Sequence, residues 1–216
     1  MALLIYPVVL EGETGCGKAA IARAIHAASP RQDQPFRPFA CAAEPSDLIE
    51  ALLFGNAAHA GLFEQAAGGT VYLHEVGTLS PSAQAQLLLV ITEHTIRADG
   101  VRVIASTPRG LAPAVAASRF DEHLLIELAR MRIMVPSLRE RPEDIPMIAN
   151  HFWRRHVGNH DAAGLDAATL TAFARYEWPG NLRELENTVE RLALERGYLG
   201  RRHGVITRGT SRHHDS

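Results

Sequence analysis

The segment Gly12–Ala19, Gly-Glu-Thr-Gly-Cys-Gly-Lys-Ala, constrains the fold more than any other part of this sequence. The apolar run Leu3–Leu10 precedes it and is typical of a buried strand, while the apolar residues of Ala19–His26 recur at helical spacing. A strand, a glycine-rich turn and a helix are the context that a phosphate-binding loop requires. Glycines let backbone amides turn toward phosphate oxygens, and the helix N-terminus and Lys18 add positive charge. The alternative is a glycine-rich turn without a ligand, and the context favours the phosphate loop.

The rest of the chain divides into an alternating and a purely helical part. Further strands are expected at residues 36–41, 70–73, 101–105 and 132–135, with helices over residues 46–53 and from Ser80 onward. This alternation predicts an α/β fold, in which helices cover a parallel sheet through right-handed crossovers. After Pro136 only helical patterns follow, at residues 142–156, 166–176 and 180–196. The sequence therefore predicts a core over residues 1–136, a small all-helical lid over 137–196 and a flexible tail over 197–216.

Composition narrows the class of protein. The formal net charge is −2 over 216 residues, which gives no electrostatic argument for nucleic acid or membrane as a partner. Cys16 and Cys41 lie outside any metal-ligand spacing, as is typical of reduced thiols. No signal-peptide pattern and no apolar run near the roughly 18 residues of a membrane span is present, so a soluble cytoplasmic protein is expected. For the tail histidines His203, His213 and His214, a solvated basic tail is favoured over a metal site.

Nucleotide hydrolysis requires more than a phosphate loop. It needs a magnesium ligand, a group that positions water, and positive charge that meets the transition state. The strand expected at residues 70–73 leads into His74 and Glu75, and Glu75 is a candidate to polarise a water molecule. However, Ala19 stands where a Ser or Thr hydroxyl usually meets magnesium, and His74 stands where an Asp would hold it. Because magnesium prefers hard oxygen ligands, it remains a candidate cofactor with an incomplete ligand set.

Several motifs occur in order between residues 8 and 196: residues 12–18, 41–43, 53–55, 63–70, 137–146 and 178–187. In this order they resemble the central AAA+ ATPase domain of NtrC-type sigma-54-dependent transcriptional activators, the bacterial enhancer-binding proteins, in a shortened and degenerate form. The resemblance implies a P-loop AAA+ core with a helical lid that binds ATP or ADP through Gly12, Glu13, Thr14, Gly15, Cys16, Gly17, Lys18 and Ala19. It also implies that Glu75 is the Walker B glutamate and that Arg183, the sensor II arginine, reaches toward the γ-phosphate.

This sequence departs from the family at positions that the family uses for ATP hydrolysis and for contact with its partners. Pro108 replaces the sensor I asparagine and, without a donor, cannot orient the attacking water. Asp121 and Glu127 replace the two arginine fingers, and a carboxylate there would repel a γ-phosphate. Residues 56–61 replace the longer loop that grips sigma-54, and the loop between Thr92 and Val101 is shortened as well. No helix-turn-helix follows residue 196, so the sequence offers no DNA-reading helix.

Three hypotheses about function follow. The first is a nucleotide-binding regulatory domain with impaired hydrolysis and impaired sigma-54 contact, acting in homo- or hetero-oligomers with AAA+ relatives. The second is an active ATPase that drives sigma-54-dependent transcription activation. The third is a non-functional gene fragment that has inherited only its fold. The first is favoured, because an intact phosphate loop accompanies altered catalytic positions.

Overall fold

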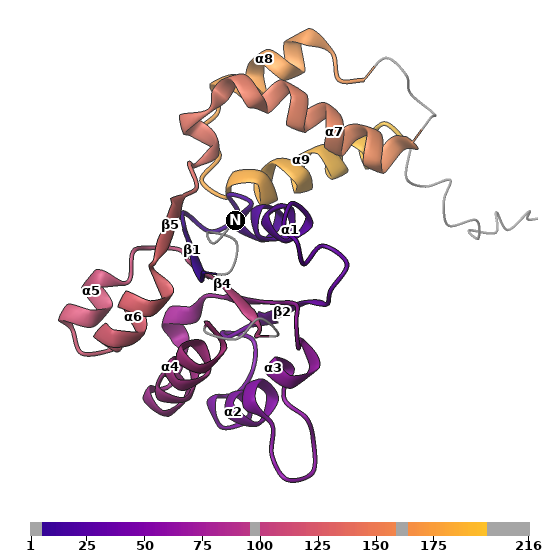
Figure 1. Cartoon of the computed structure of the whole chain (residues 1–216). Coiled ribbons are helices and arrows are strands. Elements are labelled where there is room, and N and C mark those ends of the chain that lie inside the picture. The colour runs from indigo at the N-terminus through magenta and orange to yellow at the C-terminus, as the bar shows by residue number, and fades with distance from the viewer. Residues whose placement is uncertain (1–5, 96–99, 159–163, 198–216) are drawn as a thin grey trace, which may run out of the picture. The chain divides into compact units, whose positions relative to one another are not determined.

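The computed structural model describes residues 6–95, 100–158 and 164–197, and the chain divides into two compact units, Met1–Ser137 and Leu138–Ser216. The first unit holds a five-stranded sheet in the order β2-β3-β4-β1-β5 (Figure 1), and its neighbouring strands pair in parallel. The strands are β1 (Val8–Glu11), β2 (Phe36–Ala40), β3 (Thr70–His74), β4 (Arg102–Thr107) and β5 (Met131–Met134). The predicted α/β fold with a parallel sheet is confirmed.

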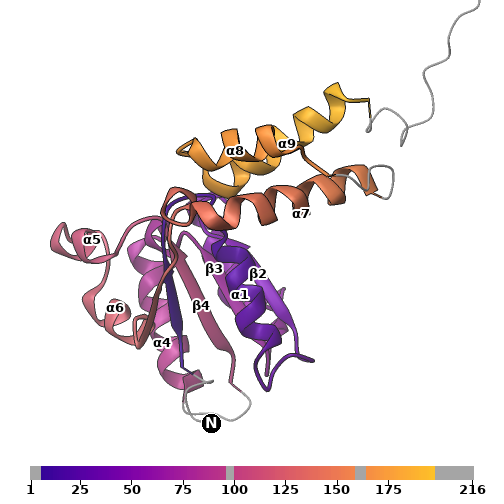
Figure 2. The same ribbon diagram turned by 90° about the horizontal axis from the view of Figure 1, so that it is seen from above.

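Helices cover both faces of this sheet, because successive strand residues point to opposite sides. Val8 and Leu10 of β1 pack in a cluster with α1, whereas Val9 packs in a cluster with residues of α2, α4 and α6. Figure 2 shows α1 and α4 on opposite faces of the sheet. The helices of this unit are α1 (Lys18–Ala27), α2 (Ser46–Phe54), α3 (Leu62–Gln65), α4 (Pro81–Thr95), α5 (Ala112–Ala116) and α6 (Glu122–Leu128).

The strand order places the end of β1 at a topological switch point. The chain leaves β1 for β2 at one edge of the sheet, and the chain leaving β4 passes β1 to form β5 at the other edge. Open α/β sheets bind ligands at such a reversal, outside the carboxyl ends of the strands. β1 is wholly buried, as a central strand requires, whereas β2 contains Pro38 and lies at an edge.

The second unit is helical. It contains the 3₁₀ turns η3 (Leu138–Glu140) and η4 (Pro142–Asp144), followed by α7 (Ile145–Val157), α8 (Ala167–Arg175) and α9 (Asn181–Glu195). Its core includes the fully buried Trp153 of α7 and Leu185 of α9, together with Trp178. The Asp166 side chain caps α8 by accepting a hydrogen bond from the Thr169 amide at 2.8 Å.

Some boundaries differ from the sequence predictions. Residues 3–5 of the predicted first strand lie outside the described residues; in the described part the strand begins at Val8, after Pro7, which has no amide to donate to a ladder. α3, α5 and α6 were not predicted, because four to seven residues are too few to reveal a helical period. The predicted tail and its histidines lie outside the described residues, apart from Gly197. Among the described helices, none is long and apolar enough to cross a membrane.

Candidate functional site

Three glycines shape the loop between β1 and α1. Gly15 and Gly17 have φ of 82° and 104°, in the left-handed region that glycine adopts without steric cost. Gly12 is needed for space, since a Cβ there would lie 2.4 Å from the carbonyl oxygen of Val135. The structure thus gives Gly12–Gly17 the compact turn that the sequence predicted, leading directly into the N-terminus of α1.

Lys18, the first residue of α1, is buried against this loop. Its Nζ donates hydrogen bonds to the carbonyl oxygens of Gly12 at 2.5 Å and Glu13 at 2.8 Å, and it lies 4.0 Å from the Cys16 sulfur. Burial lowers the pKa of Lys18, and the Cys16 and Glu75 side chains partly oppose this effect. The loop therefore holds a buried cation among turned backbone amides, which is the arrangement that binds phosphate.

Glu75 follows β3 in a constrained conformation. Its φ of 60° and ψ of 49° are left-handed, which costs a residue with a side chain about 1 kcal/mol or more. The carbonyl oxygen of Glu75 accepts hydrogen bonds from the amide of Thr78 at 3.0 Å and from its hydroxyl at 2.8 Å, and this turn fixes the residue. Burial lowers the pKa of Lys18 and the Glu75 carboxylate partly opposes this, so the charge of the predicted Walker B residue acts on the phosphate-loop lysine.

The same carboxylate also acts on two neighbouring polar groups. Burial is the main cause that raises the pKa of the Cys41 thiol to about 12, and Glu75 adds to it. Burial likewise raises the pKa of Tyr72, whose hydroxyl lies 3.0 Å from the Ser106 hydroxyl. Cys41 is consequently a protonated, buried thiol, in agreement with its packing in the core.

The positions expected to hold magnesium lack its preferred ligands. Ala19 is exposed on the first turn of α1 and offers only a methyl group. The His74 ring packs edge-to-face against Tyr72 at 6.2 Å between ring centroids. Of the three positions Ala19, His74 and Glu75, only the last offers an oxygen, so these residues do not fit a protein-held magnesium ion.

A cavity of about 300 Å³ opens beside Glu75 at the end of β4. Its lining includes Thr107, Pro108 and Arg109 from the end of β4, and Arg119 from the turn before α6. The Thr107 hydroxyl donates to the Arg109 carbonyl oxygen at 2.5 Å, which closes the backbone turn after the strand. Pro108, at the predicted sensor I position, thus lines the cavity but brings no hydrogen-bond donor.

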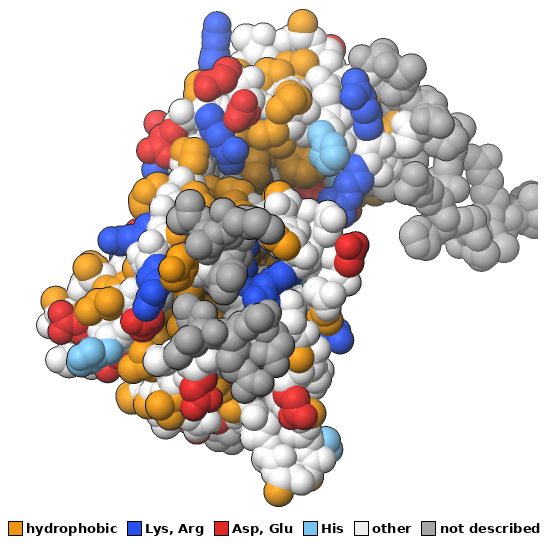
Figure 3. All heavy atoms as spheres, in the orientation of Figure 1, with side chains coloured by type: hydrophobic (Ala, Val, Ile, Leu, Met, Phe, Trp, Pro, Cys, Tyr) orange, Lys and Arg blue, Asp and Glu red, His pale blue; other side chains and the backbone are white. Residues whose placement is uncertain are grey.

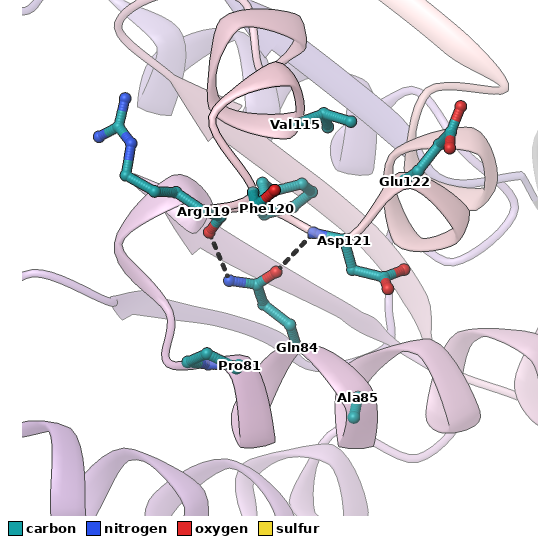
Figure 4. A pocket seen from close by; sticks show the side chains of 9 residues that line it. Pro81, Gln84, Ala85, Val115, Arg119, Phe120, Asp121 and Glu122 are labelled. Carbon is teal, nitrogen blue, oxygen red and sulfur yellow. Dashed lines mark hydrogen bonds between the residues drawn. The ribbon is translucent and has the colours of Figure 1, made fainter.

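Asp121 and Glu127, at the predicted arginine-finger positions, have structural partners within their own unit. Asp121 caps α6, accepting a hydrogen bond from the Leu124 amide at 2.7 Å. Its own amide donates to Gln84 Oε1 at 2.8 Å at a second cavity, of about 370 Å³ (Figure 4). Glu127 forms an ion pair with Arg130 at 2.7 Å. Neither position supplies positive charge.

An ion pair at the end of β1 was not predicted. Glu11, 4% exposed, accepts two hydrogen bonds from Arg132 of β5, at 2.6 and 3.2 Å. The Val135 amide donates to the Glu11 carbonyl oxygen at 2.7 Å. These bonds attach β5 to β1 immediately before the phosphate loop. Glu11 and Arg132 are 121 residues apart in the chain, and no local sequence pattern indicates that they pair.

The segment predicted to replace the sigma-54-contacting loop forms a closed turn. Gly55 and Ala60 form an isolated antiparallel bridge, and Asn56 Oδ1 accepts hydrogen bonds from the amides of Ala58 at 2.9 Å and His59 at 3.0 Å. Gly61 is required there, since a Cβ would lie 2.4 Å from the Gly55 nitrogen. The short turn is thus fixed by its own hydrogen bonds. The second shortened loop includes residues 96–99, which lie outside the described residues.

Arg183 belongs to the second unit and is exposed on the first turn of α9. The turn that precedes it is tightly held. Trp178 and Asn181 have φ of 50° and 54°, and the Leu138 amide donates to Asn181 Oδ1 at 2.8 Å. The Gly180 amide donates to Glu184 Oε2 at 2.8 Å. Arg183 lines an open hollow with Glu184, Asn187 and Arg191, and its assignment as sensor II stays a prediction.

The surface of the described residues carries charges of both signs. On the face drawn in Figure 3, basic and acidic side chains are interspersed with apolar ones. This distribution agrees with the formal net charge of −2.

Two family models match the chain. The Sigma-54 interaction domain matches residues 1–134, and the AAA+ ATPase lid domain matches residues 139–198. The chain belongs to the sigma-54 interaction domain family of AAA+ proteins. The predicted family is therefore confirmed, and with it the P-loop AAA+ core and helical lid.

Individual relatives support this membership. The transcriptional regulatory protein XylR of Pseudomonas putida is 44% identical over 203 residues, which cover 85% of this chain and 36% of XylR. ZraR of Escherichia coli K12 is 41% identical over 206 residues, covering 87% of this chain and 47% of ZraR. The crystal structure of NtrX from Brucella abortus in complex with ADP aligns with a TM-score of 0.82 and 32% identity, over 90% of this chain and 47% of that chain. This chain spans less than half the length of these relatives.

Proposed function

We propose that this chain is an ATP- or ADP-binding regulatory domain of the bacterial sigma-54 activator family, and that it hydrolyses ATP poorly or not at all. The observation that carries the proposal is a contrast, within one site, between residues suited to binding phosphate and residues unsuited to hydrolysis. The phosphate loop and Lys18 have the geometry for binding phosphate, while Ala19, His74 and Pro108 lack the groups that hydrolysis needs. NtrX, crystallised with ADP and with ATP, supports nucleotide as the ligand class.

Nucleotide titration combined with phosphate release tests this proposal. We expect saturable binding of ATP and ADP, loss of binding in Lys18→Ala, and no steady phosphate release with Mg²⁺ present. Turnover that disappears in Glu75→Gln would instead establish an active ATPase. If neither nucleotide binds and Lys18→Ala behaves like wild type, the chain is an inherited fold without nucleotide function.

The contact with sigma-54 is proposed to be impaired. The support is the closed turn between Gly55 and Gly61, because its hydrogen bonds leave no extended loop to reach a partner. A pull-down with sigma-54, in the presence of ATP, ADP or an ATP analogue, measures this contact. Robust nucleotide-dependent binding would contradict the proposal.

The output is proposed to come from association with AAA+ relatives, in the cytoplasm, with Arg183 of the lid contacting the nucleotide. Asp121 and Glu127 replace the cations that the family extends toward the neighbouring subunit, so any ring of identical copies should be weak. Sedimentation with an ATP analogue checks this, since a stable ring of this chain alone would refute it. Arg183→Ala should weaken ATP binding if the lid arginine reaches the nucleotide.

A further inference from the structure

Two arginines of the first unit line the cavity beside Glu75. Arg109 and Arg119 are both exposed. Within residues 6–95, 100–158 and 164–197, neither guanidinium makes a hydrogen bond or an ion pair. The Arg132 guanidinium, by contrast, is bound to Glu11. Two uncommitted cations therefore border a cavity of about 300 Å³.

The backbone around Arg119 is fixed by Gln84. Gln84 Nε2 donates to the Arg119 carbonyl oxygen at 3.1 Å, and Gln84 Oε1 accepts from the Asp121 amide at 2.8 Å. Ser118, with φ of 52°, makes the preceding turn. Gln84 thus fixes the backbone on both sides of Phe120, and in Figure 4 the Arg119 side chain is directed away from the Asp121 carboxylate.

The cavity adjoins the phosphate loop at the end of β4, because Thr107 lines the cavity and its carbonyl oxygen accepts a hydrogen bond from the Gly12 amide at 3.3 Å. Glu75 lines the same cavity, and its charge partly opposes the lowering of the Lys18 pKa by burial. The Glu11 carboxylate lies next to the lining residue Gly110, but Arg132 pairs with it. Arg109 and Arg119 therefore add two positive charges to a cavity that also holds the negative charge of Glu75. An anion that reaches past the loop toward Glu75 would meet this excess of positive charge.

We propose that Arg109 and Arg119 form an anion subsite for the terminal phosphate of ATP. The two arginines would then replace, within one chain, the positive charge lost at the predicted arginine-finger positions. The inference rests on the proposed nucleotide binding. Pro108 brings no donor to the cavity, and Asp121 and Glu127 bring no cation. Guanidinium groups bind phosphate through paired, charge-assisted hydrogen bonds. ADP lacks the phosphate that would occupy this subsite, so the arginines make the site select ATP over ADP.

Competition titrations of the whole chain with ATP and ADP test the subsite. We compare wild type with Arg109→Gln, Arg119→Gln and the double variant, and use Arg130→Gln as the control for lost charge, because Arg130 pairs with Glu127 outside the cavity. Each cavity substitution should raise the Kd for ATP about tenfold, leave the Kd for ADP within about twofold, and be partly rescued by Arg119→Lys. The control should change neither constant.

The outcomes separate the subsite from the proposed function. Unchanged ATP affinity in the double variant, with ADP still bound, would overturn the subsite and leave nucleotide binding intact. Equal losses of ATP and ADP affinity would also overturn it, because they would show a general effect on the phosphate loop. If wild type binds neither nucleotide, the proposed function itself fails and the subsite fails with it.

Discussion

Replacing Gly12 with alanine tests whether the approach of β5 shapes the phosphate loop. The added Cβ would lie 2.4 Å from the Val135 carbonyl oxygen, whereas ordinary contact begins at 3.4 Å. The loop and β5 would therefore have to separate by about 1 Å. The Cys16 sulfur, 3.1 Å from the same Cβ, opposes movement of the methyl group toward the loop.

The loss of stability follows from the hydrogen bond that joins the end of β5 to the end of β1. The Val135 amide donates to the Glu11 carbonyl oxygen at 2.7 Å, one residue before Gly12. A separation of about 1 Å would stretch this bond beyond hydrogen-bonding distance, which costs about 1–3 kcal/mol for a buried backbone group. Overpacking adds about 1–3 kcal/mol. We therefore expect the free energy of unfolding to fall by about 2–6 kcal/mol.

Urea unfolding, followed by circular dichroism, measures this loss. With a slope of about 2 kcal/mol per molar urea, the midpoint should fall by about 1 M or more. The affinity for ADP should fall as well, because the loop amides move with Gly12. Gly110→Ala is the matched control, since its Cβ would lie 3.5 Å from Glu11 Oε2, an ordinary contact.

The reasoning is refuted if Gly12→Ala unfolds at the wild-type midpoint and binds ADP with wild-type affinity. That result would mean that β5 and the loop separate at no cost. Equal effects of Gly12→Ala and Gly110→Ala would likewise contradict an explanation based on the 2.4 Å approach.

Three further predictions concern single side chains. Asp121→Ala removes the cap of α6 and should lower stability by about 1 kcal/mol, whereas Asp121→Asn keeps the acceptor and should lower it less, as thermal unfolding can show. Burial lowers the pKa of Lys18, so the unfolded chain binds this proton more tightly and the folded protein gains stability as the pH rises toward 10.5. Lys18→Met should lack this gain in stability, as unfolding experiments at a series of alkaline pH values can show. Hydrogen bonds from the Thr169 amide and hydroxyl hold the pKa of Asp166 at about 2, so the stability it adds is lost as the pH falls from 3.8 toward 2. Asp166→Asn should lose this acid dependence. Acid unfolding followed by the fluorescence of Trp153 and Trp178, the two tryptophans of the chain, measures the difference.

The phosphate loop was predictable because its signals are local. Glycines at positions 12, 15 and 17, a lysine at 18 and apolar runs on both sides lie within one short stretch of chain. The parallel sheet followed from the alternation of apolar segments with helical patterns. The lid helices showed their apolar period over nine to fifteen residues, whereas the shorter helices of the core did not.

The roles of the charged groups were less predictable. The family resemblance predicted that Asp121 and Glu127 stand at arginine-finger positions, but their bonds to Leu124 and Arg130 depend on α6 and on the second residue after it. Arg119 lies far from Glu75 in the sequence and lines the same cavity only because its turn is held by Gln84 of α4.

The sequence by itself determined the strands, the longer helices, the phosphate loop and the family, because these depend on residues close together in the chain. Only the tertiary structure decided which side chains meet. The sheet order puts β1 between β4 and β5, so Glu11 pairs with Arg132, and the cavity beside Glu75 receives Arg109 and Arg119. Such pairings depend on strand order and helix packing over separations that no local pattern records.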